Sequence, residues 1–285
     1  DGIAMDWGSR QAISAVFQKM VRREGFGDVL ADGILIAAEK IGRGSESYAM
    51  HCKGLPLFIE DPIKQRGKAL SMAVGPRGDH YRGYPFLEAR NHRLDYAGLE
   101  EEELKKARES VYLEAEKISG TRKGAMPCEY EGKPAMIKHS EDIEAIIDAV
   151  GICKWATFRF GVDAYSIEDQ ARILSVGLGR EMNPARLFEL AERMRCLERA
   201  FSIREGLDRS QDVLPKRFYK LKTDEGLTLS SEKMEEMKSE YYAVRGWDAD
   251  TGVPRRETLE QLGLSDVAKD LEKLGKLNDK TTGEQ

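Results

Sequence analysis

The 285-residue chain is poor in cysteine, and its cysteines lie far apart. None forms a close pair such as C-x-x-C, which zinc sites and disulfide frameworks usually contain. From this spacing alone we expect buried, reduced thiols in a cytoplasmic protein. Any metal site that used one of them would need ligands from outside the chain. The cysteines are Cys52, Cys128, Cys153 and Cys196.

The chain also lacks an excess of positive charge and any long apolar run. It has 45 Lys and Arg residues against 50 Asp and Glu residues, whereas a nucleic-acid-binding surface normally needs a basic excess. The chain contains no run of about 18 apolar residues, the length needed to span a membrane. It also has no charged-then-apolar leader of the kind that directs secretion. We therefore expect a cytoplasmic protein with no nucleic-acid or membrane partner. The chain begins at Asp1 rather than at a methionine, which suggests a piece of a longer protein.

Convincing alternation of apolar and polar residues is absent as well, so no strand is predicted. Helical spacing is found nearly throughout instead. In residues 9–25, Ile13, Phe17 and Met20 recur at helical spacing before a terminating glycine. Residues 27–42 predict a second, continuous helix that also ends at a glycine. The sequence therefore predicts an all-α, multihelical fold.

Two later helices have recognisable ends. One is predicted to begin with Ser140 as its N-cap and to end at Gly151, after an irregular connector over residues 120–139. Another is predicted to begin at Asn183 and Pro184. The apolar stripe of the first consists of Ile143, Ile146, Ile147 and Val150.

A proline-containing stretch, KGLPLFIEDPIKQRG at residues 53–67, is typical of an extended connection. We therefore predict two helical subdomains, residues 1–52 and residues 53–285.

The loop at residues 75–83 is the first candidate for chemistry. Its glycines allow close approach of the backbone to a ligand, and Arg77 and Arg82 suit phosphate or carboxylate groups. His80 could move a proton near neutral pH. The alternative is an ordinary polar loop with surface arginines, which the local residues by themselves favour.

The second candidate is the segment from Asp148 to Lys154. It combines a carboxylate acceptor, a glycine that permits close backbone approach, and the thiol of Cys153, a soft metal ligand. The alternative, which the local residues favour, is that Asp148 faces solvent while Cys153 packs in the core. A third segment, at residues 197–218, is rich in arginine and glutamate, and its arginines could bind an anion together with Arg193. Ion pairs within the chain are the favoured interpretation. The arginines of this candidate are Arg193, Arg199, Arg204 and Arg209.

Six segments, taken in order, resemble the tungsten-containing aldehyde:ferredoxin oxidoreductase family, specifically its C-terminal helical domains 2 and 3. The segment WGSRQAISAVFQKMVRREGFGDVLADGILIAAEKIG is similar to a family helix pair with a G-D-x-L-A-x-G signature. KGLPLFIEDP resembles its K-G-L connector, GPRGDH its arginine-glycine-histidine loop, and DAVGICK its D-x-x-G-L-C motif. LERAFSIREGLDRSQDVLPKRF and YYAVRGWDADTGVPRRETLEQLGL are similar to its C-terminal signatures.

The resemblance implies tungsten, or molybdenum, held by two pterin dithiolenes. A neighbouring [4Fe-4S] cluster would pass electrons to ferredoxin or to an electron-transfer subunit. By position, Cys153 would be the fourth cluster ligand, consistent with Cys₄-ligated clusters. Asp148 would hydrogen-bond a pterin, Gly151 and Ile152 would contact it through their backbone, and Lys154 would contact the same cofactor.

The resemblance also assigns roles to residues of the loop at residues 75–83. Arg77 and Arg82 correspond to cofactor-contacting positions, and His80 would assist proton transfer at the substrate. The loop is one residue shorter than the usual R-G-x-C-H or R-G-x-D-H pattern, and Ile63 replaces the arginine of the usual D-P-R. These departures leave open another branch, the tungsten subunit of class II benzoyl-CoA reductases.

In this family a β-rich cofactor domain, three cluster cysteines and a catalytic glutamate precede these segments. Residues 1–52 would then be the end of the second domain and residues 53–285 the third. We expect oxidation of an aldehyde to a carboxylic acid by the whole protein, and an inactive chain when it is isolated. The alternatives are reduction of an aryl-CoA thioester and a non-catalytic helical interaction module. A homodimer is left open.

Overall fold

The computed structural model describes residues 2–57, 62–78, 83–154 and 166–277. These residues form twelve α-helices, short 3₁₀ turns and one two-stranded hairpin, so the prediction of an all-α fold is confirmed. No helix of the described ranges is both long and apolar enough to cross a membrane.

The first elements are the helices α1 (Arg10–Arg22), α2 (Phe26–Ala31) and α3 (Ile34–Ile41), the turn η1 (Ser45–Ser47) and the hairpin strands β1 (His51–Cys52) and β2 (Leu55–Pro56). The middle of the chain forms α4 (Arg66–Val74), α5 (Phe86–Leu94), α6 (Glu101–Ser119), the turn η3 (Arg122–Ala125) and α7 (Lys133–Val150). The last part forms α8 (Ile167–Leu178), α9 (Pro184–Arg204), the turns η6 (Arg209–Gln211) and η7 (Lys216–Tyr219), α10 (Ser231–Val244), α11 (Arg256–Gln261) and α12 (Ser265–Lys273).

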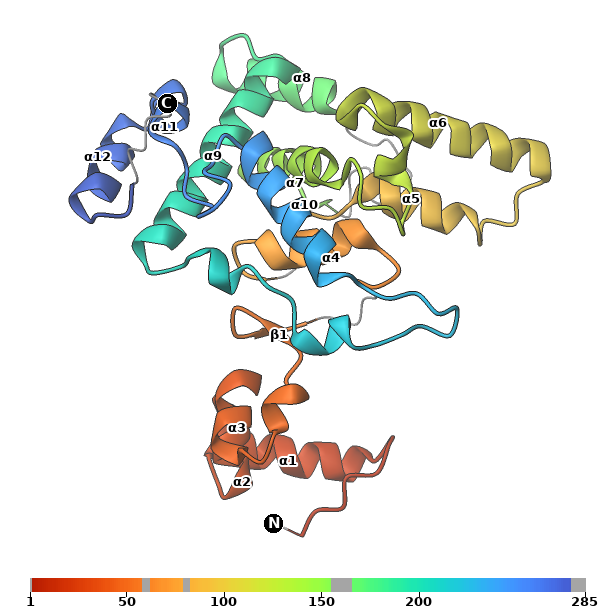
Figure 1. Cartoon of the computed structure of the whole chain (residues 1–285), viewed down its shortest axis with the longest axis vertical. Coiled ribbons are helices and arrows are strands. Elements are labelled where there is room, and N and C mark those ends of the chain that lie inside the picture. Colours follow the sequence, from red (N-terminus) through yellow and green to blue (C-terminus); the bar gives the residue numbers. More distant parts are fainter. Residues whose placement is uncertain (1, 58–61, 79–82, 155–165, 278–285) are drawn as a thin grey trace.

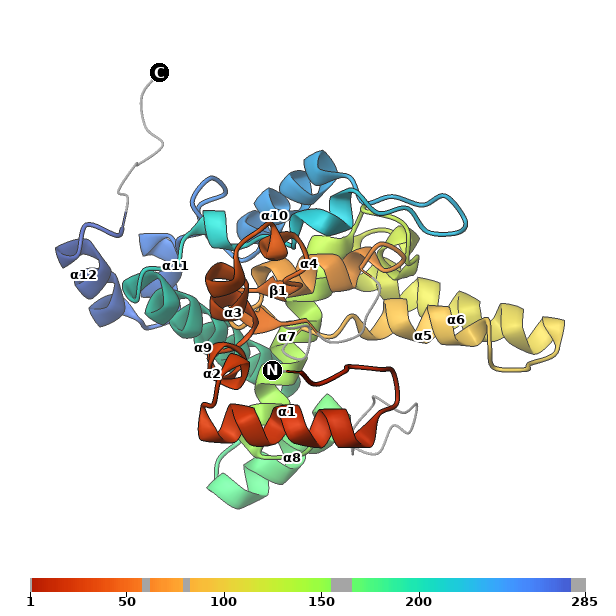
Figure 2. The same ribbon diagram turned by 90° about the horizontal axis from the view of Figure 1, so that it is seen from below.

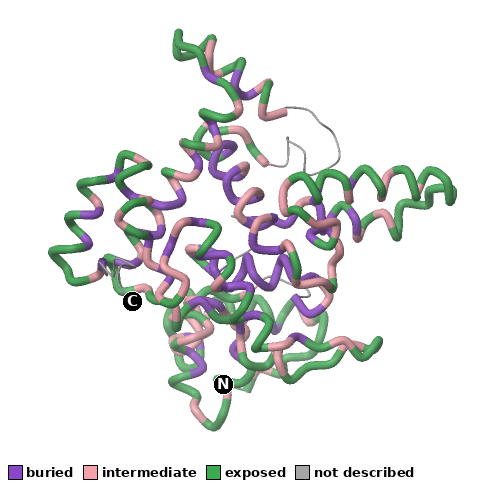
Figure 3. The backbone as a smooth tube through the Cα atoms, turned by 45° about the horizontal axis from the view of Figure 1, so that its top comes forward, coloured by how far each residue is buried: buried purple, intermediate pink, exposed green. Residues whose placement is uncertain are grey.

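The centre of the molecule is built from α4, α7 and α10 (Figure 1). Leu70 and Met72 of α4 belong to one buried apolar cluster with Ile137 of α7 and with Met237 and Tyr242 of α10. Figure 3 shows the buried residues gathered around this centre. Helix α4 is buried over its whole length, and the candidate segments lie next to these central helices, one at the end of α7 and one directly after α4.

Helices α1–α3 form a separate group below β1 in Figure 1, and Figure 2 shows this group in front of the central helices. The predicted continuous helix over residues 27–42 is wrong, because the chain breaks between α2 and α3. Gly33 has φ 88° and ψ 170°, a conformation that glycine adopts without steric penalty. The apolar spacing of α1 is present, but Ile13 and Phe17 are 58% and 63% exposed.

Helix α7 begins earlier than its sequence signals predict. The connector expected over residues 120–139 is helical from Lys133 onwards, and Ser140 lies inside the helix, 2% exposed, rather than at its N-cap. Gly132 in a left-handed conformation, followed by Pro134 in the first turn, starts the helix instead. The predicted end at Gly151 is confirmed, and so is the start of α9 with Asn183 as its N-cap.

Buried ion pairs hold α7 against its neighbours. Arg245, just after α10, lies 2.5 Å from both Glu141 and Asp142 of α7, and Arg195 of α9 donates hydrogen bonds to the backbone carbonyl of Glu141. The hydroxyl of Tyr241 donates to Glu141 at 2.6 Å. Buried charges require such partners, so these contacts fix how α7 is oriented.

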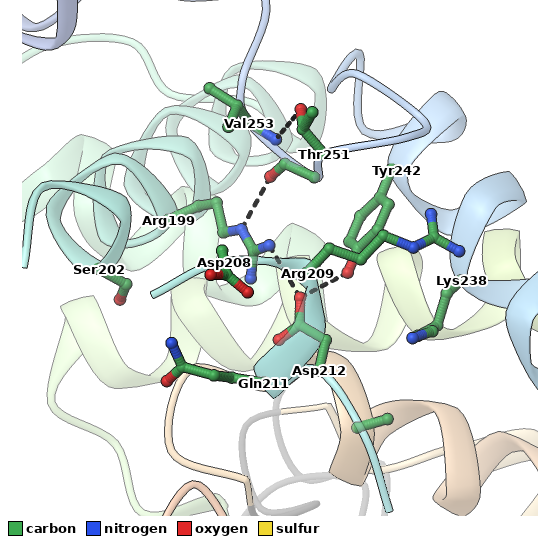
Figure 4. A network of polar contacts seen from close by, with 12 residues as sticks. Arg199, Ser202, Asp208, Arg209, Gln211, Asp212, Lys238, Tyr242, Thr251 and Val253 are labelled. Carbon is green, nitrogen blue, oxygen red and sulfur yellow. Dashed lines mark hydrogen bonds and ion pairs between the residues drawn. The ribbon is translucent and has the colours of Figure 1, made fainter. Parts of the chain in front are cut away.

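A second buried network surrounds Asp212 (Figure 4). Its carboxylate pairs with Arg199 of α9 at 2.8 Å and with Lys53 of the hairpin turn at 2.9 Å, and it accepts a hydrogen bond from Tyr242 of α10. Residues distant in sequence are thereby joined at one point. The two strands of the hairpin lie on either side of the predicted boundary between residues 1–52 and residues 53–285. The division into these two subdomains stays a prediction.

Candidate functional site

The C-terminal end of α7 carries the DAVGICK motif. Gly151 ends the helix with φ 77°, and the backbone N–H groups of Gly151 and Ile152 both donate to the carbonyl of Ile147. This left-handed cap turns the chain sharply, so that Cys153 leaves the helix axis at once. Cys153 is an exposed free thiol. The local expectation that it packs in the core is therefore wrong.

Other members of the motif are accessible from the same end of the helix. Asp148 is exposed one turn before the cap, and Ile152 is half-buried. A side chain built at Gly151 would meet no atom of the described residues within 4 Å. A carboxylate, an open backbone turn and a thiol therefore lie together on the surface at the end of α7.

Glu144 connects this motif to the glycine-rich loop. It lies one turn before Asp148 and is 0% exposed. One carboxylate oxygen lies 3.2 Å from the Nζ atom of Lys154, and the other accepts a hydrogen bond from the backbone N–H of Tyr84. Burial raises the pKa of the Glu144 carboxyl to about 7, against the opposing effect of Lys154. Sequence reasoning missed this residue, because Glu144 is not part of the apolar stripe of the helix and its contact with Tyr84 joins segments distant in the sequence.

The loop itself is only partly described. His80 and Arg82 lie outside the described residues, while Arg77 is exposed. A side chain at Gly78 would lie 2.5 Å from the Cβ atom of Cys52, and one at Gly83 would lie 2.7 Å from the Cγ atom of Glu141. These two glycines are therefore needed where the loop packs against the hairpin and α7, rather than only for approach to a ligand.

The remaining cysteines differ in environment. Cys52 and Cys196 are buried, and burial raises the pKa of each thiol to about 12. Cys128 is exposed, like Cys153. In the described ranges, no group of three or more His, Cys, Asp or Glu side chains could hold a metal ion. An exposed thiol fits one position of a Cys₄-ligated cluster, so Cys153 fits the cluster as one ligand of a set that the described residues do not complete.

Three arginines of the third candidate segment form ion pairs within the chain, which is the favoured interpretation. Arg199 pairs with Asp212, Arg204 with Glu205 at 2.9 Å, and Arg209 with Glu235 at 2.8 Å. These guanidinium groups are therefore not a ready anion site.

The chain matches known proteins over nearly its whole length. Residues 1–264 match the family described as aldehyde ferredoxin oxidoreductase, domains 2 and 3. The chain is 29% identical over 266 residues to the tungsten-containing aldehyde ferredoxin oxidoreductase of Pyrococcus furiosus, and 30% identical to that of Pyrococcus horikoshii. Each match covers 91% of this chain and 38% of the relative. The chain thus spans well under half the length of these relatives.

A third relative is the WOR-like subunit of the aliphatic sulfonate oxidoreductase of Pyrococcus furiosus, 26% identical over 289 residues, covering 96% of this chain and 38% of that protein. Among solved structures, the active site complex BamBC of benzoyl coenzyme A reductase in complex with 1,5-dienoyl-CoA matches with a TM-score of 0.68 and 25% identity. That match covers 99% of this chain and 42% of the other.

Proposed function

The chain belongs to the aldehyde ferredoxin oxidoreductase family, and from this premise we propose that it is the C-terminal part of an enzyme that oxidises an aldehyde to a carboxylic acid. The observation that carries the proposal is the exposed Cys153 at the end of α7, in the motif that resembles the family's cofactor motif. Electrons would leave through a [4Fe-4S] cluster to ferredoxin or to an electron-transfer subunit.

The tungsten or molybdenum bis-pterin cofactor would supply the redox chemistry, and the protein would hold and orient it. The Cys153 thiolate would ligate the cluster. Asp148 would accept a hydrogen bond from a pterin N–H group, and the backbone turn at Gly151 and Ile152 would allow close approach. Lys154, already oriented by Glu144, would contact the same cofactor.

The glycine-rich loop would complete the site. Arg77 and Arg82 would bind anionic groups of the cofactor with their guanidinium groups, and an imidazole nitrogen of His80 would move a proton at the substrate. The roles of His80 and Arg82 rest on the sequence motif. Because the chain spans 38% of its relatives, we expect the isolated chain to bind little cofactor.

The test uses the product of the complete reading frame, purified without oxygen. We expect it to contain tungsten or molybdenum together with cluster iron, and Cys153→Ala to lose iron. Cys128→Ala is the matched control, because Cys128 is also exposed but lies outside the motif. Protein with neither metal would contradict the enzyme proposal, and unchanged iron in Cys153→Ala would remove that residue from the ligand set.

A second candidate is the reduction of an aryl-CoA thioester by the same cofactor. It is favoured by the likeness to the benzoyl coenzyme A reductase complex over 99% of this chain, and by Ile63 and the shortened loop. Turnover with an aldehyde and a ferredoxin-type acceptor, against turnover with an aryl-CoA thioester, separates the two. A reading frame without upstream cluster cysteines would instead favour a non-catalytic interaction module. A cytoplasmic location and a homodimer stay predictions.

A further inference from the structure

A pocket of about 1150 Å³ lies between the α1–α3 group and the central body. Its walls come from the segment around η1, from the hairpin and from the chain around η7. Figure 1 shows β1 next to this last segment. Pockets for small ligands typically measure roughly 300–1,000 Å³, so this one has room for a nucleotide-sized molecule.

Three cations from one short segment line the pocket. Lys216, Arg217 and Lys220 are all exposed. No carboxylate within the described ranges forms an ion pair with any of them, unlike Arg199 and Arg209 in the same stretch of chain. Among the described residues that line the pocket, Glu46 is the only acidic one. The positive charge of the pocket is therefore not balanced by the protein, and a multiply charged anion would balance it.

An exposed aromatic ring lines the same pocket. Tyr48 is 69% exposed, and the guanidinium group of Arg217 lies 5.0 Å from the centre of its ring. A flat apolar molecule can stack on such a ring, and nucleobases do so at many binding sites. Leu35 and Val213 contribute apolar surface to the same pocket. The lining therefore combines a stacking surface with cations.

The wall that carries the cations is anchored by the buried Asp212 network (Figure 4). Asp212 lies four residues before Lys216 and is held by Arg199 and Lys53. Pro215 then restricts the backbone at the start of η7. Because this wall is ordered before any ligand arrives, binding would cost little additional ordering.

We propose that this pocket binds a nucleoside diphosphate group, with its phosphates against Lys216 and Lys220 and its base on Tyr48. Free ADP carries this group, and so does coenzyme A. The inference does not rest on the proposed function, because none of these residues belongs to the Asp148–Lys154 motif or to the loop at residues 75–83.

Isothermal titration calorimetry of the product of the complete reading frame, purified without oxygen, with ADP, coenzyme A and pyrophosphate tests the proposal. We expect saturable binding that weakens with added salt, because charge contacts are screened. The double variant Lys216→Gln/Lys220→Gln should bind ADP about tenfold or more weakly, since each charged hydrogen bond contributes substantially. The control Lys106→Gln/Lys222→Gln removes the same charge outside this pocket and should change the dissociation constant less than about twofold.

Tyr48→Ala tests the stacking part separately. It should weaken ADP binding by about fivefold or more and leave pyrophosphate binding unchanged, because only ADP has a base to stack. Tighter binding of coenzyme A than of ADP would identify a coenzyme A thioester as the source of the group, and the reverse would identify a free nucleotide. Absence of saturable binding, or equal losses in both lysine double variants, would overturn the proposal. Equal losses for ADP and pyrophosphate in Tyr48→Ala would overturn the placement of the base.

Discussion

At the scale of single residues, Glu144 is the side chain that joins the two candidate segments. Its two carboxylate oxygens contact Lys154, next to Cys153, and the backbone of Tyr84, next to the glycine-rich loop. Glu144 is fully buried and the side chain of Lys154 is mostly buried, so water screens these contacts little. We infer that this carboxylate positions the turn that presents Cys153.

Glu144→Gln should change how stability depends on pH. Burial raises the pKa of the Glu144 carboxyl from 4.5 to about 7, so the folded protein holds this proton more tightly than the unfolded chain. The stability due to this group is therefore present below pH 4.5 and is lost as pH rises through 7. Relative to the wild type, Glu144→Gln should gain up to about 3 kcal/mol of unfolding free energy across this interval.

Urea denaturation of both proteins at several pH values between about 5 and 7.5 measures the effect. Glu225→Gln is the control, because hydrogen bonding to Lys64 lowers the pKa of the exposed Glu225 carboxyl to about 2. Its contribution is lost only as pH falls towards 2, so its profile should parallel that of the wild type in this interval. Parallel profiles for Glu144→Gln would contradict the assigned pKa.

At the scale of elements, the crossing of α1 and α2 depends on Gly27. A Cβ atom at this position would lie 2.4 Å from the carbonyl carbon of Lys19. Backbone atoms cannot rotate away as the end of a side chain can, so the two helices would have to separate. This close approach explains why the G-D-x-L-A-x-G signature of the sequence begins with a glycine.

Gly27→Ala should therefore loosen the α1–α3 group by about 1–3 kcal/mol, the usual cost of forcing atoms into a packed contact. Amide hydrogen exchange should become faster in α1 and stay unchanged in α7, since the two belong to different packed groups. Gly177→Ala is the matched control, because Gly177 lies in α8 and a Cβ atom added there would meet, among the described residues, no atom outside the backbone of its own helix within 4 Å. It should be neutral or stabilising by up to about 1 kcal/mol. If amide hydrogen exchange in α1 is unchanged in the Gly27→Ala variant, the crossing of α1 and α2 does not depend on Gly27.

At the scale of the whole molecule, Asp212 joins parts that the chain order separates. It holds the hairpin turn through Lys53, α9 through Arg199 and α10 through Tyr242. All of these groups are buried. Removal of its charge would leave two buried cations without a counter-ion.

Asp212→Asn should therefore destabilise the protein by about 3–5 kcal/mol, as removal of one partner from a buried ion pair generally does. Chemical denaturation monitored by circular dichroism measures this loss. Asp208→Asn is the control, because Asp208 is exposed and caps η6 through Ser210, which an asparagine can also do. A loss in Asp212→Asn no larger than in Asp208→Asn would show that the network contributes little.

Local signals in the sequence were sufficient for part of this protein. The spacing of apolar residues predicted the all-α fold, the glycine after Val150 predicted the end of α7, and Asn183 with Pro184 predicted the start of α9. These features depend on interactions among neighbours along the chain. The motifs, in their order along the chain, were also enough to identify the family.

Only the tertiary structure decided the rest. The exposure of Cys153 and the position of Ser140 inside a helix both depend on how α7 packs against α9 and α10. The break at Gly33, the pairing of Asp212 with Lys53, and the pocket lined by Tyr48 and Lys216 bring together side chains that sequence spacing does not relate. Burial and ion pairing are set by contacts between distant segments, so no local pattern determines them.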